Sequence, residues 1–294
     1  LDLVNALRGF SILEFLAQNQ FPENFERDYA GGAGFTNTAL LTNFYIPLAA
    51  LTGLSGQTLQ YMMIGLEVIC VTFASLYLFQ TLMRLVSGDK TILPLAMIWL
   101  VIVLNLSFVI KPDLANFSFP FYHGQFYGFG DAARLMAIAF FLQRRWALTA
   151  ILLIFGFMIH PIKTLLAGVF IAGAGLADWR RTISLQSILW AFISLFGVGA
   201  WAYFILRIGQ GGDVPPVPLA EFTAYTRIFQ VHWYPFDMGY FGAHYHNATA
   251  PFMGLMGVML LALAQISLPK EWVARLLGGF AALSIVTLAG LWIS

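Results

Sequence analysis

The chain has 294 residues, of which 60% are hydrophobic and only 10% are charged, and 28 of them are phenylalanine. Its mean hydropathy of +0.78 is too high for an ordinary soluble domain, so we expect an integral membrane protein. The net charge of +1 gives no basic face for nucleic acid, and the one cysteine, Cys70, cannot form an intramolecular disulfide.

Apolar blocks follow one another along the chain, and each is judged against the length of a membrane span. A bilayer core about 30 Å thick needs about 20 apolar residues in a helix. The clear blocks are Thr58–Leu85, Ile92–Ile110, Ala132–Gln143, Trp146–Ile159, Leu165–Ala177, Ile188–Leu206, Ala250–Leu268 and Leu276–Ile293. Leu1–Ala17 is a weaker block, and Ala39–Leu51 is expected to lie at the interface as a short helix. The sequence therefore predicts an all-α membrane protein, residues 1–294 forming one polytopic domain of eight or nine spans.

The breaks between the blocks alternate in charge, which predicts their orientation. Short cytoplasmic loops carry an excess of Lys and Arg. Every second break is basic; these are Arg84 with Lys90, Arg144–Arg145, Arg180–Arg181 and Lys270 with Arg275. The other long breaks, at about residues 19–57, 111–130 and 209–248, should then lie on the non-cytoplasmic face, with His160–Lys163 beside them or just below. Acidic, histidine and aromatic residues thus fall on one predicted face.

Three blocks are shorter than a span, namely Ala132–Gln143, Trp146–Ile159 and Leu165–Ala177. Short helices at membrane depth are tolerated only where their ends meet protein or a water-filled cavity. A funnel open to the outer face would satisfy this requirement.

Two acidic features are candidates for chemistry. Glu26 and Asp28 flank Arg27 in the first outer break, and acids two apart on an extended segment point to the same side. There they could act as a general base or hold a divalent ion, with Asp28 the expected ligand, although a solvated charge cluster is the plainer interpretation. Glu67 lies within an apolar block, where an acid is costly and hence a functional candidate. A structural hydrogen bond to a neighbouring helix would explain it equally well.

Two further candidates stand at predicted helix ends. Residues 128–134 are expected to be a loop that leads into a helix, with Asp131 as the N-cap and Arg134 paired to it one turn later. A cap with its ion pair accounts for Asp131, but Arg134 would lie inside the membrane. At His160-Pro161, proline ends one helix and precedes another, so His160 could carry a proton and Lys163 could contact a phosphate.

The longest polar break, Gly209–Asn247, combines basic residues with aromatic ones. Arg227 suits bidentate phosphate recognition, and His232 precedes the rings of Trp233 and Tyr234. The spacing of His244 and His246 suits a strand and only weakly indicates a metal pair. An aromatic belt at the membrane interface explains the Trp and Tyr residues without a ligand.

Four features together resemble the polytopic glycosyltransferases of the C superfold. They are the triplet Glu26-Arg27-Asp28, the stack of short spans, the turn His160-Pro161, and the later loop with Arg227 and His232-Trp233-Tyr234-Pro235. Related bacterial membrane proteins of unassigned function share this pattern, which covers about residues 19–240. The resemblance implies a multi-pass protein of the bacterial inner membrane that transfers a sugar from a polyprenyl-phosphate donor on the non-cytoplasmic face. Glu26 or Asp28 would serve as base or metal ligand, and His160, Lys163, Arg227 and His232 would contact the donor phosphate.

Two alternatives stay open. Ala6-Leu7-Arg8-Gly9-Phe10 resembles the start of membrane acyltransferases that modify surface sugars, but Gln18, Asn19 and Gln20 stand where that family has a histidine. A non-enzymatic subunit that packs against lipid or other membrane subunits would also fit the composition. Catalysis predicts that Glu26, Asp28, His160 and Arg227 converge on one cavity.

Overall fold

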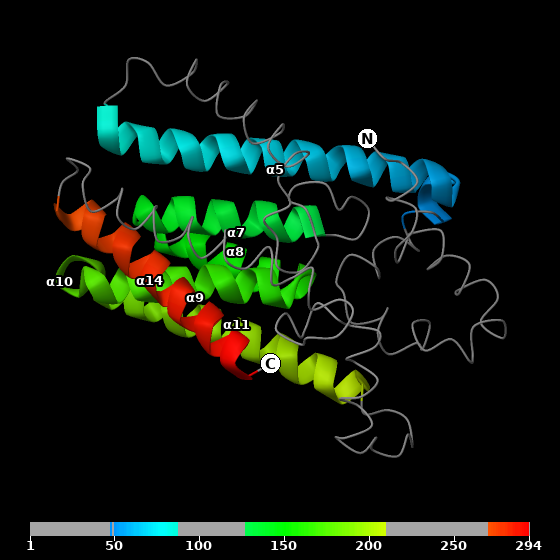
Figure 1. Ribbon diagram of the computed structural model, residues 1–294. Coiled ribbons are helices and arrows are strands. Elements are labelled where there is room, and N and C mark those ends of the chain that lie inside the picture. The colour runs from blue at the N-terminus through cyan, green and yellow to red at the C-terminus, as the bar shows by residue number, and fades with distance from the viewer. Residues whose placement is uncertain (1–47, 49, 88–126, 210–269, 294) are drawn as a thin grey trace. The chain divides into compact units, whose positions relative to one another are not determined.

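The computed structural model describes residues 48, 50–87, 127–209 and 270–293. Over these ranges the chain is helical, without strands, which confirms the all-α prediction for this part of the chain. The long helices are α5 (Gly56–Ser87), α7 (Tyr127–Leu142), α8 (Trp146–Ile159), α9 (Pro161–Ala177), α11 (Leu185–Gly209) and α14 (Lys270–Ile293), and α10 (Trp179–Thr182) is a short one (Figure 1). The predicted blocks Leu1–Ala17, Ile92–Ile110 and Ala250–Leu268, and most of Ala39–Leu51, lie outside the described residues.

Two of the described helices are long and apolar enough to cross a membrane. The stretches are Tyr61–Leu82 of α5, with 22 residues, and Leu185–Phe204 of α11, with 20 residues. Each reaches the length needed for a bilayer core. Most of the α11 stretch is exposed, including the side chains of Leu185, Phe192 and Phe196. Exposed apolar surface on this scale marks contact with lipid or another protein.

The three short blocks are confirmed as short helices, of 16, 14 and 17 residues for α7, α8 and α9. The predicted turn at His160-Pro161 is also confirmed, because α8 ends at Ile159 and α9 begins at Pro161. Proline fits the first position of a helix, where its missing N–H would have had no intrahelical partner.

The start of α7 corrects one prediction. The helix begins at Tyr127, so the expected loop at residues 128–130 is helical and Asp131 lies in the second turn rather than at the N-cap. The glycines of this turn allow close helix packing instead of a loop. A Cβ on Gly130 would lie 2.9 Å from Cβ of His160, and one on Gly128 would lie 3.1 Å from Cβ of Glu67.

The described helices belong to two compact units, and each is described by itself. The first contains residues 56–82, 127–167 and 185–209, and the second contains 83–87, 168–184 and 270–293. In the first unit α8 packs against both α7 and α11. In the second unit the end of α9 packs on α14, which crosses it obliquely (Figure 1).

A polar network joins α5 to Gln143, the residue that follows α7, within the first unit. The Tyr77 hydroxyl donates to Oε1 of Gln143 at 3.1 Å, and Nε2 of Gln143 donates to Oγ1 of Thr81 at 2.7 Å. The Thr81 hydroxyl in turn donates to the backbone carbonyl of Tyr77 at 2.9 Å. Because polar groups at membrane depth must be satisfied by protein, this network suits a helix that crosses the bilayer.

Small residues set the distance between helices in both units. In the first, a Cβ on Gly156 of α8 would lie 2.8 Å from Oγ1 of Thr164 and 3.0 Å from Cβ of Ala133. In the second, a Cβ on Gly173 of α9 would collide with the carbonyl of Gly278 on α14. Such glycines let backbones approach closely, which is typical of helix pairs in membranes.

Candidate functional site

The predicted site residues divide into two groups. Outside the described residues lie Glu26, Asp28, Arg227, His232, His244 and His246, so their predicted roles as base, metal ligand or phosphate contact stay predictions. The described group contains Arg134, His160, Lys163 and Glu67. The structure brings Arg134, His160 and Lys163 together around Asp131.

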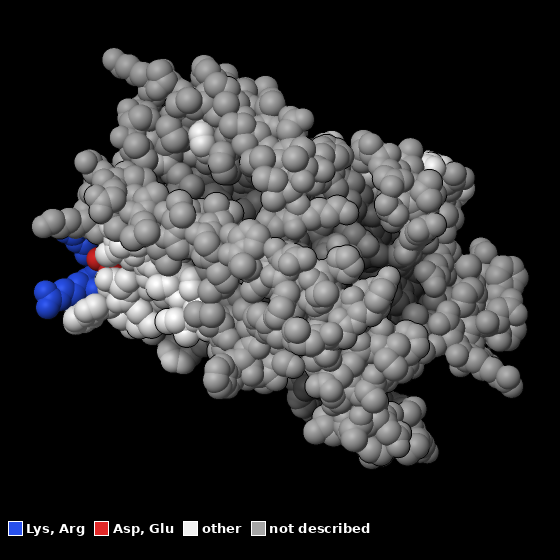
Figure 2. All heavy atoms as spheres, viewed as in Figure 1, with Lys and Arg blue, Asp and Glu red and all other residues white. Residues whose placement is uncertain are grey.

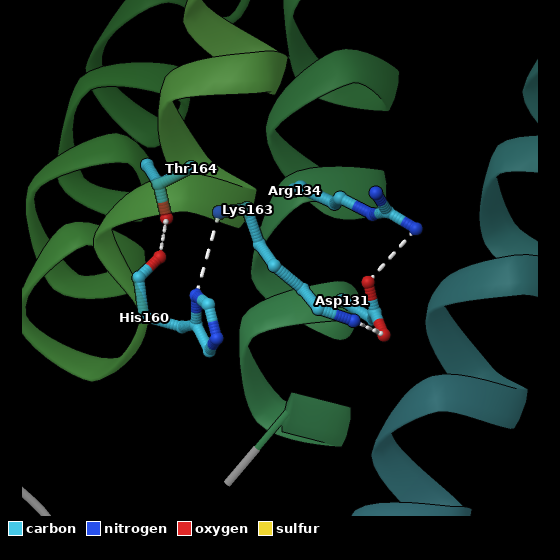
Figure 3. Close-up of polar contacts among 5 residues, drawn as sticks. All are labelled: Asp131, Arg134, His160, Lys163 and Thr164. Carbon is cyan, nitrogen blue, oxygen red and sulfur yellow. Dashed lines mark hydrogen bonds and ion pairs between the residues drawn. The ribbon is translucent and has the colours of Figure 1, made fainter. Parts of the chain in front are cut away.

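The carboxylate of Asp131 joins the second turn of α7 to the first turn of α9 (Figure 3). Nζ of Lys163 donates to Oδ2 of Asp131 at 2.6 Å. Nη2 of Arg134 lies 2.8 Å from Oδ1 of Asp131, an ion pair without the alignment of a hydrogen bond. The predicted pairing of Arg134 with Asp131 is therefore confirmed, and Lys163, which lies 32 residues away in sequence, adds a second cation. We call these three residues with His160 the Asp131 cluster.

In the Asp131 cluster the acidic side chain is more deeply buried than the basic ones. The Asp131 side chain is 3% exposed, whereas those of Arg134 and Lys163 are 27% and 19% exposed. The acid is thus the most buried member, and its two cations are partly exposed (Figure 3). With a neutral His160, these side chains carry one negative and two positive charges.

His160 both ends α8 and caps α9. Its backbone N–H donates to the carbonyl of Gly156 at 2.8 Å, and its Nδ1 accepts a long hydrogen bond, 3.4 Å, from the N–H of Lys163 (Figure 3). A side chain that accepts from the third residue of a helix is an N-cap. The acceptor role of Nδ1 places the imidazole proton on Nε2, which can donate to an anion. The capping role also shows that His160 has a structural function.

Burial and, to a lesser extent, the positive charge of Lys163 lower the pKa of His160 from 6.5 to about 4. The carboxylate of Asp131 has the opposite effect but is outweighed. The imidazole is therefore neutral at neutral pH. This fits the N-cap hydrogen bond, since an imidazolium has no lone pair with which to accept one.

Glu67 packs against the neighbouring helix α7, and its predicted hydrogen bond to a neighbouring helix stays a prediction. Its side chain is 1% exposed and packs against Gly128, with Cβ, Cγ and Cδ 3.1–3.4 Å from where a glycine Cβ would be. Gly128 lies in the first turn of α7, where the helix dipole is positive and favours a nearby carboxylate. The dipole of α7 thus offsets part of the cost of burying this acid.

The central role of Asp131 and the packing role of its glycines were missed by sequence reasoning. The sequence predicts Asp131 as a helix N-cap, and local spacing could not show that Lys163 of α9 pairs with it. Gly128 and Gly130, two residues apart just before Asp131, were the available clue, because glycines inside a helix often mark close contact with another element.

The chemistry of the Asp131 cluster favours anion binding. Both oxygens of Asp131 face cations, so this carboxylate is poorly placed to accept a proton from a substrate. Over the described ranges no group of three or more His, Cys, Asp or Glu residues could hold a metal ion. The predicted divalent ion at Asp28 lies outside them. Arginine and lysine beside an imidazole N–H are the donors that phosphate groups prefer.

The described part of the chain is thus helical, with two helices able to cross a membrane and a buried acid that contacts two cations. In comparisons with known proteins, the chain matches no protein family, no curated protein and no solved structure.

Proposed function

We propose that this chain is a multi-pass protein of the bacterial inner membrane that binds polyprenyl-phosphate sugar and transfers the sugar on the non-cytoplasmic face. It would have eight or nine spans and resemble the glycosyltransferases of the C superfold. The observation that carries the proposal is the Asp131 cluster, in which a buried acid holds the partly exposed Arg134 and Lys163 beside His160. The exposed apolar face of α11 supports the membrane location, since it suits lipid chains.

In the proposed reaction an acceptor hydroxyl attacks the anomeric carbon of the donor sugar. A new carbon–oxygen bond forms as the bond between that carbon and the phosphate oxygen breaks, and the bonding electrons leave with the polyprenyl phosphate. Glu26 or Asp28 takes the hydroxyl proton. Arg134, Lys163 and the Nε2–H of His160 stabilise the growing negative charge on the phosphate, with Arg227 and His232 as further contacts.

A second candidate is a polyprenyl-phosphate-binding subunit without catalysis. It is favoured by the pairing of Asp131 with two cations, because the Asp131 cluster by itself then binds an anion but offers no carboxylate as base. The two candidates differ only in whether Glu26 or Asp28 acts in a transfer step.

Binding can be tested with a photoreactive polyprenyl phosphate and the full-length protein in nanodiscs. Crosslinks should map to α7 and α9, and excess polyprenyl phosphate should compete whereas the uncharged polyprenol should not. Lys163→Met should lower labelling about tenfold or more, because a charge-assisted contact is lost, and Lys163→Arg should restore most of it. Labelling that is equal in wild type and Lys163→Met would end the proposal.

Transfer is tested separately with a radiolabelled polyprenyl-phosphate sugar in vesicles that contain acceptor lipids and glycans. Asp28→Ala and Arg227→Ala should abolish transfer while the protein stays folded. Full activity in both variants would remove the enzymatic version. Crosslinking without transfer from any of a panel of donor sugars would favour the binding subunit.

A further inference from the structure

The turn between α7 and α8 presents two adjacent exposed arginines, Arg144 and Arg145, which we call the basic turn. The N–H of Arg145 donates to the carbonyl of Phe140 at 2.8 Å. That of Arg144 donates to the carbonyl of Phe141 at 2.9 Å, which completes a Schellman motif at the end of α7. The motif holds Arg144 at a φ of 60°, a left-handed conformation in which glycine is usual. Among the described residues it is the only non-glycine with a positive φ, so a long basic side chain lies where the backbone favours none.

The guanidinium groups of the basic turn are available to a ligand. Neither pairs with an acid among the described residues. That of Arg145 lies 5.9 Å from the ring centroid of Phe140, a cation–π contact that leaves its N–H donors in use by no acid. Asp131, the acid of α7, lies in its second turn, about 16 Å from the end of the helix along its axis. Its own cations, Arg134 and Lys163, occupy both of its oxygens.

Hydrogen bonds within the first unit place the basic turn level with one end of a candidate span. Gln143, directly before Arg144, is hydrogen-bonded to Tyr77 and Thr81 of α5, which runs beside α7 (Figure 1). Thr81 is next to Leu82, the last residue of the candidate span of α5. The alternation of charge in the sequence predicts this turn on the cytoplasmic side, where the leaflet carries anionic lipid.

An exposed apolar stripe on α8 begins next to the basic turn. Leu148, Ile151 and Phe155 are 38%, 54% and 44% exposed, and their spacing of three and four residues places them on one face of the helix. The stripe extends about 10 Å along α8. Trp146, which is partly exposed, lies in sequence between the basic turn and the stripe, and tryptophan favours the headgroup level of a bilayer. On the face drawn in Figure 2, the Lys, Arg, Asp and Glu side chains that are visible likewise lie together, next to uncharged ones.

We infer that the basic turn binds the phosphate of an anionic phospholipid whose acyl chains lie along Leu148, Ile151 and Phe155. Two guanidinium groups supply the charge-assisted hydrogen bonds that a phosphate accepts. Arginines next to a span attract anionic lipid, and the apolar stripe adds a contact that a free phosphate ion cannot use. The inference rests on the membrane insertion contained in the proposed function and not on sugar transfer.

The test is native mass spectrometry of the full-length protein, purified in mild detergent and mixed with equal amounts of phosphatidylglycerol and phosphatidylcholine. Wild type should retain phosphatidylglycerol in preference. Arg144→Gln with Arg145→Gln should reduce that preference about tenfold or more, the effect of two lost charges at the membrane surface. Arg144→Lys with Arg145→Lys retains both charges and should retain most of the preference.

Arg144→Gly separates lipid binding from a structural role of the turn. Glycine adopts a φ of 60° without strain, so the melting temperature should stay the same or rise. The lipid preference should nevertheless fall about fivefold, because one phosphate contact is lost. Arginines that only complement the dipole at the end of α7 would leave the preference of Arg144→Gly unchanged, and that result would overturn the inference.

The matched control is Arg180→Gln, which removes an exposed arginine from the second unit. It should leave the lipid preference unchanged, and a loss as large as that of Arg144→Gly would overturn the inference. Displacement of phosphatidylglycerol by millimolar inorganic phosphate would also overturn it, because a free anion would then suffice. Lys163→Met should keep the lipid preference, and Arg144→Gly should keep the crosslinking of polyprenyl phosphate to α9, so the two proposals can fail independently.

Discussion

The Asp131 cluster and the pair between Asp178 and Arg275 both join helices through a buried charged side chain. The most buried member is the acid in the cluster and the cation in the pair. In the cluster the acid is 3% exposed and its cations are 27% and 19% exposed. In the pair the guanidinium of Arg275 is 2% exposed and the acid is 12% exposed. Arg275 also lies 4.9 Å from the ring centroid of Trp272. The buried cation of the pair contacts both Asp178 and Trp272 and so has a structural role, whereas the partly exposed cations beside Asp131 can meet a ligand.

The largest effect is expected for Asp178→Ala, which leaves the buried guanidinium of Arg275 without its carboxylate. Breaking a buried pair by removing one partner costs about 3–5 kcal/mol, so the free energy of unfolding should fall by that amount. The measurement is reversible unfolding in mixed micelles. Arg180→Gln, at an exposed position two residues away, should change it little. A small decrease in the free energy of unfolding for Asp178→Ala would contradict the structural role of the Asp178–Arg275 pair.

Asp131→Ala should cost less, about 1.5–3 kcal/mol, the range for hydrogen bonds to charged groups. Arg134 and Lys163 are partly exposed and can turn their charges toward water, so neither is left buried. The same unfolding experiment applies to both acids. If Asp131→Ala destabilised the protein as much as Asp178→Ala, the distinction between an outward cluster and a closed pair would be lost.

Gly173→Ala tests the close packing that supports the Asp178–Arg275 pair. The added Cβ would collide with Ala282 and with the carbonyl of Gly278, so α9 and α14 must move apart, at a cost of about 1–3 kcal/mol. Gly168→Ala is the control on the same helix, because a Cβ there meets nothing within 4 Å. Alanine is the better helix former, so this control should be neutral or stabilising by up to about 1 kcal/mol. Equal melting temperatures for the two variants would contradict the packing.

A pH dependence of stability is expected from His160 in the Asp131 cluster. Between pH 6.5 and about 4 the unfolded chain protonates His160 while the folded protein keeps it neutral. The unfolded state then binds more protons, so the free energy of unfolding falls as pH falls through this window. The contribution should be about 3 kcal/mol between neutral pH and pH 4, because one pKa unit corresponds to about 1.4 kcal/mol. His160→Asn retains a capping acceptor, and its melting temperature should fall less between these pH values. If the melting temperatures of wild type and His160→Asn fell equally between these pH values, the predicted contribution of His160 would be refuted.

Much of the helical layout could be predicted from local sequence. The bounds of α8 agree with the apolar block Trp146–Ile159, and Pro161 marks the start of α9 because proline fits the first helical position. The start of α7 was missed, since Gly128 and Gly130 are typical of loops in isolation and become helical only where another helix packs against them. The residues of the candidate site on α7 and α9 were identified singly, but their arrangement was not.

The sequence by itself determined that this chain is highly apolar and helical over the described residues, with charge confined to helix ends and a few interior positions. Those properties follow from composition and local spacing. Only the tertiary structure decided which charges meet. Lys163 reaches Asp131 across 32 residues because Gly130 has no side chain to keep α7 away from His160. Burial then decided which member of each ion pair faces outward, and burial depends on packing that local sequence does not encode.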